Sequence, residues 1–183
     1  MQIGPTLETA RLILRPPIQD DLDAWADIYG DAENLRFIGG AQPRDAAWRY
    51  MATMVGGWVL QGYAMFSVIE KQSGRVIGRL GPWRPGGKEA NWPGDEVGWI
   101  LIPSAQGKGY AFEASVAAMD WAFDHLGWSE IIHCITPPNA KAIALAERLG
   151  SRWLRRDRLP APFEGPIEIY GQTKEQWRAR NPR

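Results

Sequence analysis

The sequence contains few residues that form cross-links or coordinate metals. It has one cysteine, Cys134, and two histidines, His125 and His133, in 183 residues. A single cysteine cannot form a disulfide within the chain, and this set is too small for a cluster of the zinc-finger kind. His133 and Cys134 are adjacent and point to opposite faces of a strand, so core packing is expected for both rather than a nucleophilic pair. We therefore expect neither an internal disulfide nor a bound metal ion.

Long apolar runs and an excess of one charge are also missing. No stretch approaches the ~20 apolar residues of a membrane-spanning helix, and the N-terminus lacks the basic-then-apolar pattern of a signal peptide. Lys plus Arg and Asp plus Glu both total 21, so bulk electrostatics give no reason to expect a nucleic-acid partner. We expect a cytoplasmic protein that binds neither nucleic acid nor membranes, as a monomer or homodimer. Its 45% hydrophobic residues suffice for a core, and residues 1–183 are expected to form a single domain.

Apolar periodicity and turn residues predict alternating strands and helices. Helices are expected directly behind Asp20 and Asp21 and at residues 44–60, 110–126 and 139–149. Strands are expected at residues 11–15, 63–70, 75–83, 95–102 and 130–135, and two more can follow at 152–156 and 167–171. This alternation around a mixed sheet indicates an α/β fold with six to seven strands and about four helices.

A glycine loop connects the strand at 95–102 to the helix at 110–126. It reads Gln106-Gly107-Lys108-Gly109-Tyr110-Ala111. A P-loop would need Ser or Thr after Gly-Lys, and a Rossmann fingerprint would need glycine at Phe112, so neither motif is present. The first N–H groups of a helix have no intrahelical partner, and the helix N-terminus carries about half a positive charge. The segment is therefore expected to bind a phosphate or pyrophosphate.

Three motifs, in order along the chain, resemble those of one enzyme family. They are the strand sequence at residues 7–15, the pattern Gln-x-x-Gly-x-Ala at 106–111, and Asn139 followed by Ala-Glu-Arg-Leu-Gly at 146–150. The glycine loop resembles the coenzyme A loop of the GNAT N-acetyltransferase superfamily. The other two motifs are similar to those of its ribosomal-protein N-terminal acetyltransferase (RimJ/RimL-like) branch. The resemblance spans most of the chain and implies a mostly antiparallel sheet that is splayed at the coenzyme A site.

The resemblance implies an acetyl-CoA-dependent N-acetyltransferase. The acetyl group would pass by direct attack to a primary amine, either a small molecule or a peptide N-terminus, with acetyl-CoA as co-substrate and no metal. A non-catalytic acyl-CoA-binding regulatory module is the alternative. Ala142 prompts it, because many relatives place Ser or Tyr near this helix to protonate the leaving thiolate, and alanine cannot do so.

The same resemblance implies which residues hold coenzyme A. Backbone amides of the glycine loop would bind the pyrophosphate, with a charge-assisted contact from Lys108. The N–H of Leu101 would face the pantetheine. Asn139 is either a helix N-cap or, as in the family, a side-chain ligand of the pantetheine. The expected cofactor-binding residues are Ile100, Leu101, Gln106, Gly107, Lys108, Gly109, Tyr110, Ala111, Asn139 and Ala142.

Glu96 and Trp99 are the expected catalytic residues. A primary amine has a pKa of roughly 8 to 10.4, so it needs a base near neutrality. Family members often place a carboxylate that acts as this base where Glu96 stands. The alternative is that Glu96 is only a surface or salt-bridged carboxylate at the end of the strand. Asp95 is a second candidate on the opposite face. By register against the family motif, the N–H of Trp99 would face the thioester carbonyl as an oxyanion-hole donor.

The acceptor pocket is expected between the loop at residues 37–44, the helix behind it and the loop at 160–166. Such loops vary without disturbing a core and often carry specificity. Phe163 would offer an apolar wall and Glu164 a partner for a cationic amine, with an exposed loop tip as the alternative. Trp83 and Trp92 flank a further loop and could line the same pocket.

Overall fold

The structure, a computed structural model, describes residues 3–87, 90–161 and 163–182. Eight strands form one sheet in the order β1-β2-β3-β4-β5-β6-β8-β7. They are β1 (Leu7–Glu8), β2 (Leu12–Arg15), β3 (Phe66–Glu70), β4 (Val76–Trp83), β5 (Glu96–Leu101), β6 (Glu130–Ile135), β7 (Arg152–Leu159) and β8 (Gly165–Thr173). The α-helices are α1 (Leu22–Gly30), α2 (Ala32–Leu35), α3 (Arg44–Gln61), α4 (Tyr110–His125), α5 (Ala140–Leu149) and α6 (Lys174–Arg180). Only β5 and β6 pair in parallel, so the α/β class and the mixed, mostly antiparallel sheet are confirmed.

The predicted numbers of strands and helices were too low. The described residues form eight strands rather than six to seven and six α-helices rather than about four. The additional elements are short: β1 has two residues, α2 has four and α6 has seven. Segments of one or two turns contain too few apolar residues to show a period. A local signal does mark α6, because Thr173 and Gln176 form a capping box at its start.

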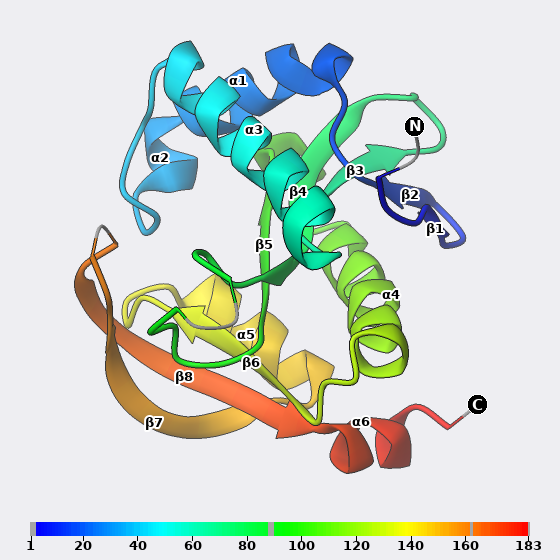
Figure 1. The fold of residues 1–183 in the computed structure, drawn as a ribbon, viewed down its shortest axis with the longest axis vertical. Coiled ribbons are helices and arrows are strands. Elements are labelled where there is room, and N and C mark those ends of the chain that lie inside the picture. Colours follow the sequence, from blue (N-terminus) through cyan, green and yellow to red (C-terminus); the bar gives the residue numbers. More distant parts are fainter. Residues whose placement is uncertain (1–2, 88–89, 162, 183) are drawn as a thin grey trace.

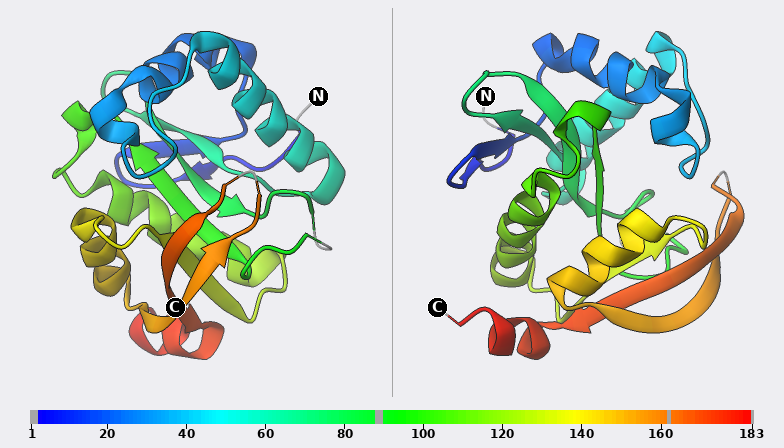
Figure 2. Two further views of the ribbon diagram at one scale, coloured as in Figure 1. Left: turned by 90° about the vertical axis from the view of Figure 1, so that its left-hand side faces the viewer. Right: turned by 180° about the vertical axis from the view of Figure 1, so that it is seen from behind.

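Helices cover both faces of the part of the sheet formed by β1 to β5. Figures 1 and 2 show α1 and α3 together on one face and α4 on the other. Trp25 of α1 is fully buried on the first of these faces, Trp58 of α3 is buried against Phe66 and Trp121 of α4, and Phe123 is buried beneath α4. The core that supports the centre of the sheet is therefore built from large aromatic side chains on both faces.

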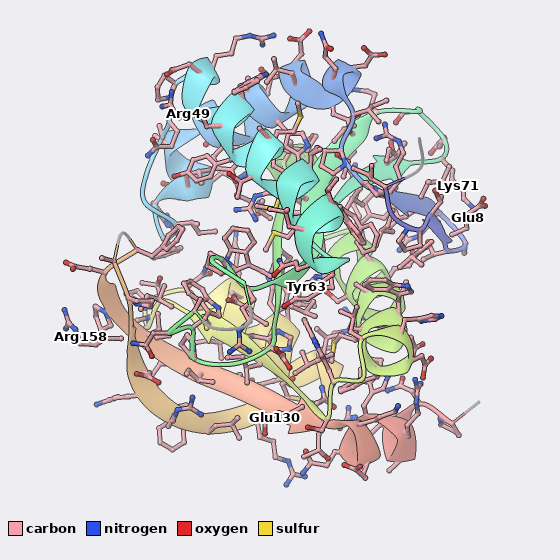
Figure 3. The ribbon with its side chains drawn as sticks, viewed as in Figure 1. Glu8, Arg49, Tyr63, Lys71, Glu130 and Arg158 are labelled. Atoms are coloured by element: carbon pink, nitrogen blue, oxygen red, sulfur yellow. The ribbon has the colours of Figure 1, made fainter. Side chains whose placement is uncertain are left out.

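Charged side chains line the two edges of the sheet. At the β1 edge, Lys71 Nζ lies 3.0 Å from Glu8 Oε2, and Figure 3 shows this pair on the opposite side of the molecule from Arg158 of β7. Along β7, the side chain of Arg156 reaches Glu168 of β8 at 2.9 Å. Charged groups on edge strands disfavour pairing with another chain, so both edges are protected in this way.

The sheet opens between β5 and β6. Strand β5 pairs with β4 along its whole length, from Glu96↔Trp83 to Leu101↔Gly78, but with β6 only at Glu96↔Ile132. Beyond that pair the two strands diverge, and β6, β8 and β7 continue as a separate curved layer beside α5, as Figures 1 and 2 show. The expected splay of the sheet is therefore present at this position.

His133 bridges the two strands where they diverge. Its buried imidazole places Nδ1 2.7 Å from the carbonyl oxygen of Val97 and Nε2 3.0 Å from Ser151 Oγ. A carbonyl only accepts, so Nδ1 carries the proton and the Ser151 hydroxyl donates to Nε2. Burial lowers the pKa of His133 to about 4, which keeps the ring neutral. The side chain thus supplies a contact that the separating backbones cannot make.

We expect His133→Phe to destabilise the fold in a pH-dependent way. The ring fills the same space but leaves the Val97 carbonyl without a partner and removes the acceptor of the Ser151 hydroxyl, whose oxygen still accepts from Gln172. We expect the free energy of unfolding at pH 7.5 to fall by roughly 2–4 kcal/mol. The native pKa of about 4 lies below the unfolded value of 6.5, so the stability that neutral His133 contributes is complete above pH 6.5. It is lost as the pH falls from 6.5 toward 4.

The difference between wild type and variant should therefore shrink by roughly 2 kcal/mol between pH 7.5 and 5. Urea unfolding at both pH values measures it. His125→Phe, at an exposed position, is the control and should change little. A difference for His133→Phe that is the same at both pH values would contradict the assignment.

Candidate active site

The glycine loop has the backbone geometry of an anion-binding turn. Gly107 and Gly109 have φ values of +74° and +80°, in the left-handed region that favours glycine. Alternation of left-handed and ordinary backbone turns successive N–H groups toward one side and forms a nest. Gly109 is the N-cap of α4 and has no side chain to bond the first N–H groups of the helix. A Cβ at Gly107 would meet nothing within 4 Å, so the space beside the loop is open.

A cationic groove continues from this loop along α4. Its lining includes Arg11, Lys108, Phe112 and Arg148, together with two carboxylates that are already ion-paired, Glu113 and Asp120. Arg11 is already engaged, with Nε 2.6 Å from Glu113 Oε2, and Arg148 lies 4.6 Å over the ring of Phe112. The ammonium of Lys108 makes no hydrogen bond or ion pair with any described residue. The groove therefore offers positive charge and an aromatic face beside the nest.

The polar groups of Gln106 are engaged within the protein. Its N–H donates to the carbonyl of Pro103 at 3.1 Å, and its side-chain Nε2 donates to Asn34 Oδ1 at 2.8 Å and to the carbonyl of Leu101 at 3.1 Å. Asn34 Nδ2 donates to the same carbonyl at 3.1 Å. Tyr110 is similarly anchored, because its hydroxyl donates to Glu70 Oε1 at 2.5 Å. The groups of this loop left for a ligand are the backbone N–H groups from Gly107 to the first turn of α4, including that of Ala111, which have no partner among the described residues.

Hydrogen-bond alternation decides which N–H groups of β5 face β6. The N–H of Ile102 donates to Ile77 of β4 at 2.9 Å, and alternate residues of an antiparallel strand face the same neighbour. The N–H of Ile100 therefore also faces β4, whereas those of Trp99 and Leu101 face the diverging β6. Neither of these two has a hydrogen-bond partner among the described residues. The structure thus places two of the three expected strand residues with free donors at the divergence.

The start of α5 lies beside the same stretch of β5. Asn139 Oδ1 accepts from the N–H of Ala142 at 3.2 Å, so this side chain acts as an N-cap, while its Nδ2 has no partner among the described residues. Ala142 packs in a cluster with Trp99 and Tyr170. Tyr170 brings the only hydroxyl group into this cluster, through the pairing of β6 with β8 at His133↔Tyr170. Local spacing could not place Tyr170 here, because the pairing joins distant parts of the chain.

Glu96 is buried at the point where the strands separate. Its side chain is 6% exposed and makes no ion pair with the described residues. Trp92 Nε1 donates to Oε2 at 2.8 Å, and the N–H of Cys134 on β6 donates to Oε1 at 3.4 Å. Burial raises the pKa of Glu96 to about 7, against the opposing effects of these two donors and of the positive charge of Arg79. Glu96 therefore exchanges a proton near neutral pH.

The second carboxylate candidate, Asp95, is engaged elsewhere. Its Oδ1 lies 2.9 Å from Arg84 Nη1 in an ion pair. Burial also raises the pKa of the Cys134 thiol well above its usual range, so the thiol is not ionised. Among the described residues, no group of three His, Cys, Asp or Glu side chains could hold a metal ion, and no helix is long and apolar enough to cross a membrane.

An aromatic cluster joins the connection between β7 and β8 to Glu96. Phe163 lies 5.6 Å from Trp92 and 6.5 Å from Trp83 between ring centroids. Since Trp92 also donates to Glu96, Phe163 is one aromatic ring away from the carboxyl group. Glu164 is exposed beside it. On the other side, Thr136 Oγ1 donates to the carbonyl of Phe37 at 2.9 Å, which joins the end of β6 to the segment after α2.

Comparison with known proteins identifies the family. Residues 11–152 match the family described as acetyltransferase (GNAT) domain. The chain is 30% identical over 146 residues to the uncharacterized N-acetyltransferase p20 of Bacillus licheniformis, which covers 79% of this chain and 80% of that protein. The chain belongs to the GNAT acetyltransferase family, whose members use acetyl-CoA.

Two solved structures show the same fold. The acetyltransferase from Agrobacterium tumefaciens str. C58 superposes with a TM-score of 0.78 and 29% identity, covering 93% of this chain and 95% of that chain. Mycobacterium smegmatis RimJ in complex with CoA-disulfide gives a TM-score of 0.76 at 17% identity, covering 94% of this chain and 89% of that chain. The neighbours thus include a RimJ protein, in agreement with the resemblance of the sequence motifs.

We expect Trp92→Phe to raise the pKa of Glu96 above its value of about 7. The phenyl ring keeps the aromatic packing but removes the N–H that stabilises the charged carboxylate, a change worth roughly half a unit to one unit. Carboxyl ¹³C NMR titration of glutamate-labelled protein measures this shift, with Glu96→Gln to assign the resonance. Trp83→Phe is the matched control, because it alters the same cluster without touching a donor to Glu96. An unchanged titration of Glu96 in Trp92→Phe would show that the hydrogen bond does not act on the carboxylate.

Proposed function

We propose that the protein is an acetyl-CoA-dependent N-acetyltransferase in which a primary amine attacks the thioester directly. The observation that carries the proposal is the position of Glu96. A buried carboxyl group with a pKa of about 7 lies at the end of the strand pairing, on the same strand that carries the free N–H groups of Trp99 and Leu101. General-base catalysis of amine attack requires such a group beside donors for a developing oxyanion.

The residues around the divergence fit coenzyme A. The nest at Gly107 and Gly109, the first N–H groups of α4 and the free ammonium of Lys108 suit a pyrophosphate. The N–H of Leu101 and the free Nδ2 of Asn139 are amide donors for the pantetheine arm, and the complex of RimJ with CoA-disulfide supports this placement by fold. When bound, acetyl-CoA supplies an acyl group activated as a thioester.

Glu96 and Trp99 would divide the chemistry between them. Glu96 takes a proton from the ammonium form of the acceptor, directly or through water, which frees the nitrogen lone pair. The nitrogen then forms a bond to the acyl carbon as the carbon–sulfur bond breaks, while the N–H of Trp99 donates to the carbonyl oxygen. The nitrogen loses its second proton to water in this step, and the departing thiolate takes up a proton, so the products are the amide and the free thiol of coenzyme A. No covalent enzyme intermediate is needed, and Cys134 remains protonated and takes no part.

Tyr170 is the side chain that could return a proton to the departing sulfur. Ala142 has none to give, but Tyr170 lies in the same cluster with Trp99. Burial raises the pKa of Tyr170, helped by the negative charges of Glu147 and Glu168, so the hydroxyl stays protonated. The acceptor would approach Glu96 from the side of α2 and Phe163, with Glu164 at the rim. Both a small-molecule amine and a peptide N-terminus fit this description.

We expect Glu96→Gln to lower kcat by roughly 10²–10⁴ and to leave coenzyme A affinity nearly unchanged. The base must be deprotonated, so the wild-type rate should rise with pH and level off above about 7, and the variant should lose this limb. Thiol release across a panel of amines measures turnover, and calorimetry measures coenzyme A binding. Glu130→Gln, at an exposed position at the start of β6, is the control. A wild-type protein that binds coenzyme A but releases no thiol with any amine would instead be a regulatory binding module.

A charge placed in the nest should weaken coenzyme A binding. Gly107→Asn and Gly107→Asp form a matched pair, because both side chains tolerate the left-handed backbone and differ mainly in charge. The Asp variant should bind at least ~10-fold more weakly than the Asn variant, since its carboxylate faces the phosphates. Calorimetry at low and high salt measures the difference, which should narrow with salt. Equal affinities would place the pyrophosphate elsewhere.

A further inference from the structure

Arg79 of β4 is a buried cation without a counterion. Its side chain is 8% exposed, and no carboxylate among the described residues lies within ion-pair distance of it. Its Nη1 donates to the sulfur of Met65, a weak acceptor, and its Nε has no partner. The guanidinium lies 5.3 Å from the ring centroid of Tyr29. Burial raises the pKa of Tyr29 more than the charge of the guanidinium and its hydrogen bond with the Tyr29 side chain lower it, so Tyr29 is neutral and supplies no negative charge.

Arg15, on the same face of the sheet, has the carboxylate partner that Arg79 lacks. Arg15, Ser67 and Arg79 are opposite one another on β2, β3 and β4. Arg15 binds both oxygens of Asp21 at 2.7 Å, and Ser67 donates to the same carboxylate. This row of residues therefore holds two arginines with a single adjacent carboxylate, that of Asp21, and Arg15 binds it. An arginine cannot lose its proton to escape burial, so an unpaired guanidinium is costly unless an anion from outside completes it.

The surface between Arg79 and Glu96 carries no side chains of its own. Gly81 follows Arg79 by two residues on β4, Gly98 follows Glu96 by two residues on β5, and the two glycines are paired in register. The space above Gly98 is filled by buried Met65, whose Cε lies 2.8 Å from the position that a Cβ would take, with Glu96 Oε1 3.5 Å from that position. A Cβ at Gly81 would lie 2.9 Å from the ring of Phe66. Met65 therefore separates the guanidinium from the carboxyl group. Methionine is unbranched and adapts easily, so a small ligand can replace it over this bare stretch of sheet.

We propose that Arg79 binds the carboxylate of the acceptor, and that the acceptor is an amine of the α-amino-acid class. Its carboxylate would form the bidentate pair that the guanidinium lacks, and its amino group would meet Glu96 over the Gly81–Gly98 pair. Both groups lie on the face of the sheet that α1 and α3 cover. This inference rests on the proposed acetyltransferase function and narrows the acceptor.

The test compares matched acceptors that differ only at the carboxylate. Free L-α-amino acids and their carboxamides are assayed as pairs with acetyl-CoA, by thiol release. With the wild-type protein, kcat/KM for the amino acids should be roughly 10²-fold higher than for their carboxamides, because two hydrogen bonds to a charged group stabilise a complex by about that factor. In Arg79→Gln this preference should collapse through a higher KM for the acids with kcat largely kept, and Arg79→Lys should retain part of it. Arg75→Gln, exposed before the same strand, is the control and should keep the preference.

A binding measurement separates this inference from the proposed function. N-acetyl-L-amino acids and their carboxamides, the acetylated forms of the same pairs, are tested for thermal stabilisation of the protein with coenzyme A present. Stabilisation by the acids alone, lost in Arg79→Gln, supports the site even without turnover. If kcat/KM is equal for acids and carboxamides, or higher for the carboxamides, the inference is wrong and the acetyltransferase proposal remains intact. If Arg79→Gln does not fold, the wild-type comparison of acids with carboxamides decides the question alone.

Discussion

The separation of β5 from β6 after a single backbone pair is the constraint on which the site depends. A strand inside a sheet normally satisfies its donors and acceptors on both sides, and leaving them unpaired is unfavourable. Here the two carbonyls of Val97 and Leu101 that face β6 are satisfied by side chains, from His133 on one hand and from Asn34 and Gln106 on the other. The N–H groups of Trp99 and Leu101 are not. The carbonyl of Trp99 faces the same side as its N–H and also has no partner among the described residues. The divergence thus leaves two donors and one acceptor free, which suits a ligand that carries both kinds of group.

Burial explains the chemistry on the face of the sheet below α1 and α3. The same desolvation that brings the pKa of Glu96 to about 7 leaves Arg79 charged, because a guanidinium cannot neutralise itself. Burial therefore favours the protonated form of Glu96, whereas Arg79 stays charged and needs an anion beside it. The arrangement places a titratable group and a permanent charge at the two ends of a surface without side chains.

Local sequence predicts most of the fold but only part of the candidate site. Strand β6 occurs at residues 130–135 as predicted, and α5 ends at Leu149 with Gly150 in the left-handed conformation, because apolar period and cap residues act locally. The glycine loop was predicted for the same reason. The environments of Glu96 and Arg79 could not be predicted, since they depend on strand register, on Met65 from another strand connection, and on the conformation of the loop that carries Trp92. In the sequence alone, Arg79 is only a charge within a strand.

The side chain of Gln106 links the glycine loop to α2 and to β5 through hydrogen bonds. Its amide bonds at once to Asn34 of α2 and to the carbonyl of Leu101 on the central strand. The glycine loop therefore cannot shift without changing the energy of α2, and α2 cannot shift without changing that of the loop. Thermodynamic linkage makes such an effect reciprocal. If coenzyme A binds the loop and the acceptor contacts α2, as proposed, the binding of each ligand changes the affinity for the other through this amide group.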